Sequence, residues 1–409
     1  MTTADSHTAA FYLELEDRYG AHNYHPLPVV LSRGQGVHVW DVDGKKYYDF
    51  LSGYSALNQG HCHPKIISSL IHQAQKLTLT SRAFHSDQMA EYTQFITRYF
   101  GYDKVLPMNT GVEAVETAIK LARRWGYDVK GIPENKARII VFEDNFHGRT
   151  STVISFSSDP ASYTGFGPFM PGFDLIPYNN PEALAKALQH KDVAAILMEP
   201  IQGEAGVVVP DDGYLSKAFA LAKEAGVLFI ADEIQTGLGR TGRMLACDHE
   251  EVRPDILILG KALSGGVLPV SAVLADDEIM LTIKPGEHGS TYGGNPLACA
   301  VAITALNVLK DEKMTENAAA MGDYFRKGLQ KIDSPFIQTI RGKGLLNAVV
   351  IHQTRPEAAW DLCLELKEHG LLAKPTHGNK IRFAPPLSIT QTQMDECLEI
   401  IEESLVILH

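Results

Sequence analysis

Short apolar runs alternate with helix-like segments through the middle of the chain. Between Arg138 and Asp276 the runs are RIIVFED, TVISFSS, VAAILMEP, VLFIADE, DILILG and PVSAVLAD. Near-continuous Val, Ile and Leu runs of this kind predict strands buried on both faces of a mainly parallel sheet. The segments between them, such as 181–190 and 214–225, predict helices. The pattern indicates a doubly wound α/β domain, with ligands expected at the carboxyl ends of its strands.

The two ends of the chain show a different pattern. Near the N-terminus, VHVWDVDGKKYYDF places a turn at Asp43-Gly44 between two β-rich runs and predicts a hairpin. A long helix is expected from about Asn295, followed by mixed helices and short strands and a last helix from about Thr390. We therefore expect three parts: an N-terminal segment, 1–55, that joins the small domain; a large domain, 56–309; and a C-terminal small domain, 310–409.

Composition narrows the classes of function. The net charge is −12 over 409 residues, without the clusters of Lys and Arg that hold phosphate backbones, which argues against a nucleic-acid partner. No apolar stretch approaches the roughly 20 residues that span a bilayer, so no membrane role is expected. The five cysteines are far apart and predict reduced thiols. The acidic first residues lack a targeting pattern and predict a cytoplasmic location.

Lys261 and Asp232 are the first candidates for chemistry. Lys261 directly follows the apolar run DILILG, so its side chain leaves a buried strand end, where burial lowers the pKa of an amine and makes it nucleophilic. Asp232 ends the run VLFIAD at the same edge of the sheet. A carboxylate there suits the ring nitrogen of pyridoxal phosphate (PLP). The alternatives are a solvated lysine at a strand exit and an acidic strand end that binds a metal or nucleotide.

A third candidate is the start of the helix after Asn109-Thr110-Gly111. Small residues leave backbone N–H groups free at this helix start, and these donors and the helix dipole favour a phosphate. The alternative is a plain N-cap formed by Thr110 or Asn109, which is compatible with phosphate binding.

Two further motifs are weaker. Residues 237–242 satisfy the Gly-x-Gly-x-x-Gly pattern, with Asp255 at the distance expected for a ribose contact, but no amphipathic helix follows them. We rank nucleotide binding below PLP binding. His61 and His63, next to Pro64, lack a tetrahedral ligand set, and no metal site is expected.

Taken together, four segments resemble class III aminotransferases of PLP fold type I: MNTGVEAVETAIKLAR, DNFHGRT, FIADEIQTGLGRTG and ILGKALSGG. Within this family the chain is similar to the ornithine aminotransferase branch, through motifs at 20–34, 60–66, 199–210 and 284–298. The resemblance implies a large domain with a mainly parallel seven-stranded sheet flanked by helices, and a smaller α/β domain. It implies transfer of the δ-amino group of L-ornithine to 2-oxoglutarate, which yields L-glutamate 5-semialdehyde and L-glutamate by a ping-pong mechanism.

The resemblance also assigns the residues around the cofactor. Lys261 is expected to form the Schiff base, Asp232 to face the ring nitrogen and Gln235 to lie near the ring hydroxyl. Phe146 is expected to stack on the ring, and Gly111 and Val112 are expected to contact the phosphate. Thr291 of the partner subunit is expected to reach the same phosphate. The last contact implies a homodimer with shared active sites.

The resemblance assigns the substrate contacts to six residues. Arg149 is expected to hold the side-chain carboxylate of 2-oxoglutarate or glutamate, and Arg382 the α-carboxylate, because a guanidinium binds a carboxylate in bidentate fashion. Glu204 is expected to pair with Arg149 or step aside. Glu199 is expected to support this switch. Tyr24 and Tyr54 are expected to position ornithine. The alternatives are ordinary salt bridges for the arginines and core packing for the tyrosines.

Residue 147 is His, where ornithine-type relatives often carry a bulkier or smaller residue, and we expect it to tune packing. The nearest competing function is an acetylornithine or 4-aminobutyrate aminotransferase. Tyr54 favours free ornithine, since those relatives tend to have an aliphatic residue there. A non-catalytic PLP-fold or nucleotide-binding regulator is the remote alternative, and the intact Lys261 and Asp232 argue against it.

Overall fold

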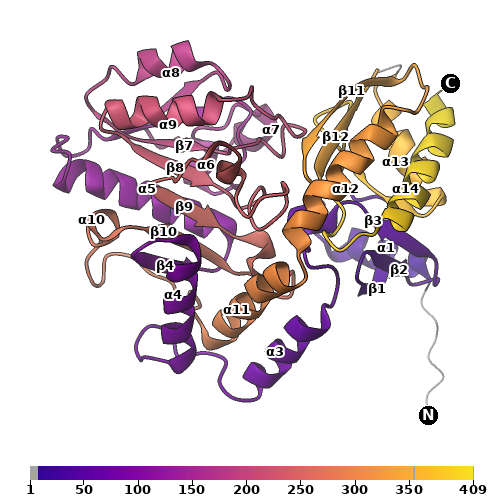
Figure 1. The fold of residues 1–409 in the computed structure, drawn as a ribbon, viewed down its shortest axis with the longest axis horizontal. Helices are drawn as coiled ribbons and strands as arrows, with labels where there is room; N and C mark the ends of the chain where they lie inside the picture. Colours follow the sequence, from indigo (N-terminus) through magenta and orange to yellow (C-terminus); the bar gives the residue numbers. More distant parts are fainter. Residues whose placement is uncertain (1–7, 353–354, 409) are drawn as a thin grey trace.

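The computed structural model describes residues 8–352 and 355–408. Figure 1 shows a large α/β body built from the middle of the chain and a smaller body in which both ends of the described chain meet. Helix α11 (Pro296–Asp311) lies where the chain passes from the large body to the small one.

The large body contains one seven-stranded sheet with the order β4-β10-β9-β8-β7-β5-β6. Strands β6, β5, β7, β8 and β9 pair in parallel, and β10 runs antiparallel to both of its neighbours. This confirms the mainly parallel sheet. The strands are β4 Lys104–Met108, β5 Arg138–Phe142, β6 Phe173–Ile176, β7 Val193–Met198, β8 Leu228–Asp232, β9 Ile256–Leu259 and β10 Ser271–Ala275.

Both faces of this sheet are buried. On β5, Ile139 and Val141 belong to the hydrophobic cluster that includes the apolar side of α5 (Gly111–Asp128), whereas Ile140 and Phe142 belong to the cluster on the other face. Side chains alternate across a strand, so covering both faces requires apolar residues at every position. This explains why the strands appear in the sequence as continuous apolar runs.

The small body holds two four-stranded sheets, ordered β1-β2-β3-β13 and β11-β12-β15-β14. The hairpin expected at Asp43-Gly44 is confirmed, because β2 pairs antiparallel with β3. Strand β13 pairs parallel with β3 and so ties the N-terminal segment to the C-terminal part of the chain. The strands are β1 Leu31–Gln35, β2 His38–Asp41, β3 Lys46–Asp49, β11 Ile337–Lys343, β12 Leu346–Ile351, β13 Leu371–Leu372, β14 Lys374–Thr376 and β15 Lys380–Phe383.

Side-chain caps fix the starts of several helices. The long helix expected near Asn295 begins as α11, and the last helix begins after its N-cap Thr390. No helix in the described ranges combines the length and apolar character of a bilayer span. The remaining helices are α1 Ala9–Tyr19, α2 Ser52–Ser55, α3 Pro64–Ala74, α4 Asp87–Phe100, α6 Ser151–Ile154, α7 Pro160–Tyr163, α8 Pro181–Ala187, α9 Tyr214–Glu224, α10 Asp277–Met280, α12 Met314–Leu329, α13 Ala358–Glu368 and α14 Gln391–Ser404, with 3₁₀ turns at Ala246–Glu250, Lys261–Ser264 and Leu405–Leu408.

One predicted strand is wrong. The run TVISFSS begins inside the short helix α6, whose Val153 and Ile154 are buried, and the outer strand of the sheet is β6 instead. A short buried helix and a buried strand give the same apolar run, so periodicity does not separate them. The domain boundaries at 55/56 and 309/310 stay a prediction.

Two glycines of α12 give a matched test of the packing beneath β11 and β12. A Cβ on Gly322 would lie 1.9 Å from the backbone oxygen of Gly344, whereas a Cβ on Gly328 would meet only the end of the Leu398 side chain. Gly322→Ala is therefore expected to lower the free energy of unfolding by about 1–3 kcal/mol, despite a gain of about 1 kcal/mol in helix propensity. Gly328→Ala should be neutral or stabilising. Denaturant unfolding of both variants measures this, and equal effects would contradict it.

Candidate active site

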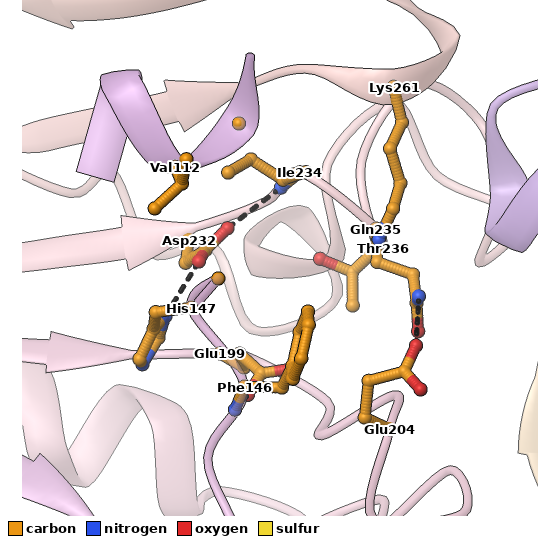
Figure 2. Close-up of a pocket in the computed structure, with 12 residues that line it drawn as sticks. Val112, Phe146, His147, Glu199, Glu204, Asp232, Ile234, Gln235, Thr236 and Lys261 are labelled. Carbon is orange, nitrogen blue, oxygen red and sulfur yellow. Dashed lines mark hydrogen bonds and ion pairs between the residues drawn. The ribbon is translucent and has the colours of Figure 1, made fainter. Parts of the chain in front are cut away.

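A cavity of about 200 Å³ opens at the carboxyl ends of the parallel strands. Glu199 follows β7, Asp232 ends β8 and Lys261 lies just beyond β9, so the sheet itself brings these groups together. Figure 2 shows their side chains around the cavity. The lining residues are Gly111, Val112, Phe146, His147, Gly148, Glu199, Glu204, Asp232, Ile234, Gln235, Thr236 and Lys261.

Lys261 supplies an amine with an unusual environment. It begins the 3₁₀ turn after Gly260 with φ +42°, a left-handed conformation that costs a non-glycine residue about 1–3 kcal/mol. Burial lowers the pKa of its amine; Glu204 opposes this shift and Arg382 adds to it. A lowered pKa leaves more of the amine neutral and nucleophilic at neutral pH.

Asp232 and His147 form a buried pair. His147 Nδ1 lies 2.6 Å from Asp232 Oδ2, and the other carboxylate oxygen accepts from Ile234 N at 3.1 Å. Burial lowers the pKa of His147, but the hydrogen bond and the charge of Asp232 outweigh burial, so its pKa is raised. His147 therefore makes a polar contact to Asp232, where the sequence suggested packing alone. The pair keeps a negative carboxylate oriented in the cavity wall.

Glu199 connects the strand ends. It accepts hydrogen bonds from Phe146 N at 2.8 Å and Gly203 N at 3.3 Å. Burial raises its pKa to about 7, against the opposing effect of His147. These bonds fix Phe146 and the loop that carries Glu204 relative to each other.

The N-terminus of α5 faces the same cavity. Thr110 and Glu113 form a capping box, and Glu113 accepts from the N–H groups of Asn109 and Thr110. The next two N–H groups, of Gly111 and Val112, remain for an anion. A Cβ on Gly148 would lie 2.4 Å from Val112 Cγ2, so this glycine permits the close approach of the loop to the helix.

Arg382 and Glu204 form an ion pair between the two bodies, and Glu204 lines the cavity. Arg382, on β15, is 3% exposed and its Nη1 lies 2.7 Å from Glu204 Oε1. Burial raises the pKa of Glu204, but Arg382 more than offsets it and the net shift is downward. Glu204 therefore pairs with Arg382 and not with Arg149 in this structure, and the expectation that it pairs with Arg149 or steps aside stays a prediction. Arg382 enters from β15 beside the loop 203–206, whereas Arg149 lies near Phe146.

Gln235 donates to Glu204 Oε1 at 3.2 Å, and its own Oε1 is buried with no hydrogen-bond partner in the described part of the chain. A buried acceptor without a donor is costly in a protein alone. This oxygen lies against Gly203, where a Cβ would come within 1.5 Å of it, and it remains an acceptor without a donor among the described residues.

Tyr54 is held in a strained turn. Residues Ser52, Tyr54 and Ser55 all have positive φ, and Asp49 Oδ1 accepts from Leu51 N and Ser52 N to stabilise the turn. The ring of Tyr54 lies 5.0 Å from the Arg382 guanidinium carbon. Nothing in the sequence indicated this strained turn, which places the Tyr54 ring next to Arg382.

Five expected residues are not part of the cavity lining: Arg382 and Tyr54, described above, and Arg149, Tyr24 and Thr291. The Arg149 guanidinium carbon is 5.9 Å from the ring of Tyr24 and 5.8 Å from that of Phe146, and both Arg149 and Tyr24 are exposed. Thr291 is exposed in a loop whose Ser290 accepts from Asn109 Nδ2 at 2.7 Å. The roles given to these residues stay predictions.

Sequence reasoning missed several wall residues: His147 as a polar partner, and Gly148, Ile234 and Thr236. Each of these residues is next to a predicted site residue in the sequence, and this proximity is the feature that could have identified them. The Gly-x-Gly-x-x-Gly segment 237–242 opens no α-helix. No group of three or more His, Cys, Asp or Glu side chains could hold a metal ion within the residues that the structure describes.

These residues fit pyridoxal phosphate. Lys261 offers an amine for its carbonyl, the Asp232 carboxylate suits a protonated ring nitrogen, and the unpartnered Gln235 Oε1 suits a ring hydroxyl. The free N–H groups at the start of α5 suit its phosphate. The sheet and this site therefore define the class of PLP-dependent transferases of fold type I.

The family follows from comparison. The profile of the family Aminotransferase class-III matches residues 19–405, so the chain belongs to the class-III aminotransferases, which depend on PLP. It is 62% identical to "Ornithine aminotransferase, mitochondrial" of Drosophila melanogaster, over 96% of this chain and 90% of the relative. It is 61% identical to the protein of the same name from Rattus norvegicus, over 98% and 91%.

Solved structures agree in fold. An ornithine aminotransferase from Toxoplasma gondii, whose description records partial occupancy of PLP at its active site, superposes with a TM-score of 0.97 at 50% identity, covering 99% of this chain and 95% of that one. An acetylornithine aminotransferase from Elizabethkingia anophelis superposes with a TM-score of 0.90 at 57% identity, covering 98% and 99%.

The expected cytoplasmic location is wrong. The relatives from Drosophila melanogaster, Rattus norvegicus and Caenorhabditis elegans are named as mitochondrial proteins. The prediction relied on the composition of the first residues alone, and that composition does not determine the compartment.

Glu199→Gln is expected to flatten the dependence of stability on pH. The folded-state pKa of Glu199, about 7, lies above its usual value, so the folded protein binds more protons and loses stability as pH rises through that interval. The free energy of unfolding of the parent should fall as the pH rises from about 5 to about 7. In the variant this fall should be smaller, by up to about 3 kcal/mol. Denaturant unfolding of the cofactor-free protein measures this. Equal slopes would refute the assignment.

Proposed function

We propose that the chain transfers the δ-amino group of L-ornithine to 2-oxoglutarate, forming L-glutamate 5-semialdehyde and L-glutamate. The observation that carries the proposal is the Arg382–Glu204 ion pair beside Lys261, which suits two substrates of different charge. The names of the relatives at 61–62% identity support the same reaction.

The cofactor supplies a carbonyl that takes up the amino group and a ring that withdraws electrons from the reacting carbon. We assign its ring to Phe146, Asp232 and Gln235, and its phosphate to Gly111 and Val112. Asp232, held by His147, keeps the ring nitrogen protonated. Lys261 carries the proton to and from the reacting carbon as general base and acid, which its lowered pKa favours.

Two substrates must use one site in turn, which implies ping-pong kinetics. When the δ-amine of ornithine reacts, the substrate's carboxylate lies at its far end, where Arg149 binds it with help from Tyr24. The reacting carbon then bears no carboxylate, and Glu204 keeps Arg382 neutralised.

With 2-oxoglutarate the far carboxylate again binds Arg149, but a second carboxylate adjoins the reacting carbon. Arg382 binds this group once Glu204 turns away, because a guanidinium pairs with one carboxylate in bidentate fashion. The Tyr54 ring lies against the Arg382 guanidinium and orients it, and Glu199 holds the backbone of the Glu204 loop at Gly203.

We also propose a homodimer with shared active sites. The loop that carries Thr291 is anchored next to the start of α5 through Ser290 and Asn109, close to the expected phosphate position. Thr291 itself is exposed, as is the neighbouring Tyr292 at 58%. A second subunit would cover this loop and bring Thr291 to the phosphate of its partner.

A specific observation supports a second candidate. The structure from Elizabethkingia anophelis is described as an acetylornithine aminotransferase and is 57% identical to this chain. N-acetylornithine differs from ornithine only at the far end of the molecule, where the acetyl group replaces a charged amine by an amide. The polar Tyr54 and Tyr24 favour the charged amine.

The amine donor is tested with the purified, cofactor-loaded protein. L-Ornithine is expected to discharge the visible absorbance of the bound cofactor in a single turnover, faster than N-acetylornithine or 4-aminobutyrate. Lys261→Ala should abolish rapid turnover, because the amine that moves the proton is lost. A preference for N-acetylornithine would instead support the second candidate.

Glu204→Gln is expected to shift the balance between the two substrates. Without the carboxylate, Arg382 stays charged beside the reacting carbon and binds dicarboxylates more readily. The variant should gain about 10- to 100-fold in kcat/KM for L-glutamate relative to L-ornithine, the range of one charge-assisted bond. Half-reaction kinetics with each amino acid measure the ratio, and Glu182→Gln on the surface of α8 is the control. An unchanged ratio would exclude the switch.

A further inference from the structure

Arg240 is a fully buried arginine without an ion-pair partner among the described residues. It is 0% exposed, and its guanidinium donates to three oxygens. Nε and Nη2 donate to Asn58 Oδ1 at 3.1 and 2.6 Å, and Nη1 donates to the carbonyls of Leu345 at 3.0 Å and Pro385 at 2.6 Å. All of these acceptors are neutral.

The acceptors belong to different parts of the molecule. Arg240 and Asn58 lie in the segments that follow β8 and α2, whereas Leu345 lies in the turn between β11 and β12 and Pro385 lies just after β15. One planar group therefore joins the large body to two separate points of the β11-β12-β15-β14 sheet. The backbone adds a bond from Leu345 N to Arg240 O at 3.0 Å.

The packing around this joint is tight. A Cβ on Gly344 would lie 2.2 Å from the carbonyl carbon of Thr241, and a Cβ on Gly242 would lie 2.9 Å from Ala319. Asn58 is itself fixed, because its side-chain Nδ2 donates to Leu238 O at 2.9 Å and its backbone carbonyl accepts from Leu387 N at 2.8 Å. The contact therefore sets one position of the sheet against the large body.

A buried cation with only neutral partners is costly to keep. Burial lowers the pKa of Arg240 to about 9, with a small opposing effect from Asp49. An arginine suits this position for a geometric reason, since its rigid fork reaches three acceptors at once. A lysine ammonium at the same place would reach fewer of them in fixed directions.

The joint lies next to a residue that the proposed reaction needs. Pro385 follows the end of β15, the strand that carries Arg382, and Leu345 precedes β12, the strand that pairs with β15. Arg240 therefore contacts the chain just after the strand that carries Arg382 and just before the strand that pairs with it.

We propose that Arg240 is a positioning residue, which holds β15 against the large body so that Arg382 meets the carboxylate next to the reacting carbon of the keto acid. This rests on the function proposed above. Arg382 acts on 2-oxoglutarate and L-glutamate, whereas ornithine is held by Arg149, which is anchored in the large body. Loss of Arg240 thus weakens one half-reaction more than the other.

The test uses the cofactor-loaded, full-length protein with Arg240→Lys, and with Arg253→Lys as control, since Arg253 is a surface arginine paired with Asp276. We expect the KM for 2-oxoglutarate to rise about 10-fold in Arg240→Lys, with kcat and the KM for L-ornithine changed by less than about threefold. The control should match the parent. Equal changes in both KM values, or no change, would overturn the proposal.

A second pair of variants covers the case in which Arg240→Lys does not fold. Asn58→Asp keeps acceptor oxygens for the guanidinium, and Asn58→Leu removes them at similar size. Asn58→Leu should show the selective rise in the KM for 2-oxoglutarate, and Asn58→Asp should not; identical behaviour of the two would overturn the proposal. Should the parent protein discharge its cofactor with N-acetylornithine and not with ornithine, the proposed donor fails, while the effect on the KM for 2-oxoglutarate still decides the role of Arg240.

Discussion

The ion pair between Arg382 and Glu204 is the contact on which the rest of the site depends. It joins β15 of the small body to the loop after β7 of the large body, and its Glu204 lines the same cavity as Lys261. Removing one partner of a buried pair leaves an uncompensated charge, so each residue fixes the other. The two bodies therefore meet at the cavity through charge as well as through packing.

The same surroundings shift neighbouring groups in different directions. Burial raises the pKa of Glu199 to about 7, whereas Arg382 holds the pKa of Glu204 below its usual value although burial opposes it. Burial lowers the pKa of Lys261. The cavity thus holds a readily protonated carboxyl, a firmly charged carboxylate and a nucleophilic amine within one set of strand ends. Environment, more than residue type, separates their roles.

The sequence predicted the sheet and the placement of Lys261 and Asp232 at one of its edges, because both depend on local pattern. Continuous apolar runs identified the buried strands, and Lys261 and Asp232 stand at strand ends that a parallel sheet brings to one edge. It failed at 152–158, where a short buried helix has the same composition as a strand.

Contacts between distant segments could not be predicted. The choice of Arg382 over Arg149 as the partner of Glu204 depends on how the small body sits on the large one, and the strained turn at Tyr54 depends on Asp49. The buried fork of Arg240 lies in a segment that carries a family motif and a weak nucleotide motif, and neither motif assigns a role to Arg240.

We expect this ion pair to open for a dicarboxylate and to stay closed for a substrate with one carboxylate. Crystal structures of the cofactor-loaded protein with glutarate and with pentanoate distinguish the two states, because the two molecules have the same chain length and differ by one carboxylate. With pentanoate the Arg382–Glu204 separation should stay near the present 2.7 Å, and with glutarate the pair should be broken, with Arg382 on the second carboxylate. The same closed pair in both structures would rule out this switch.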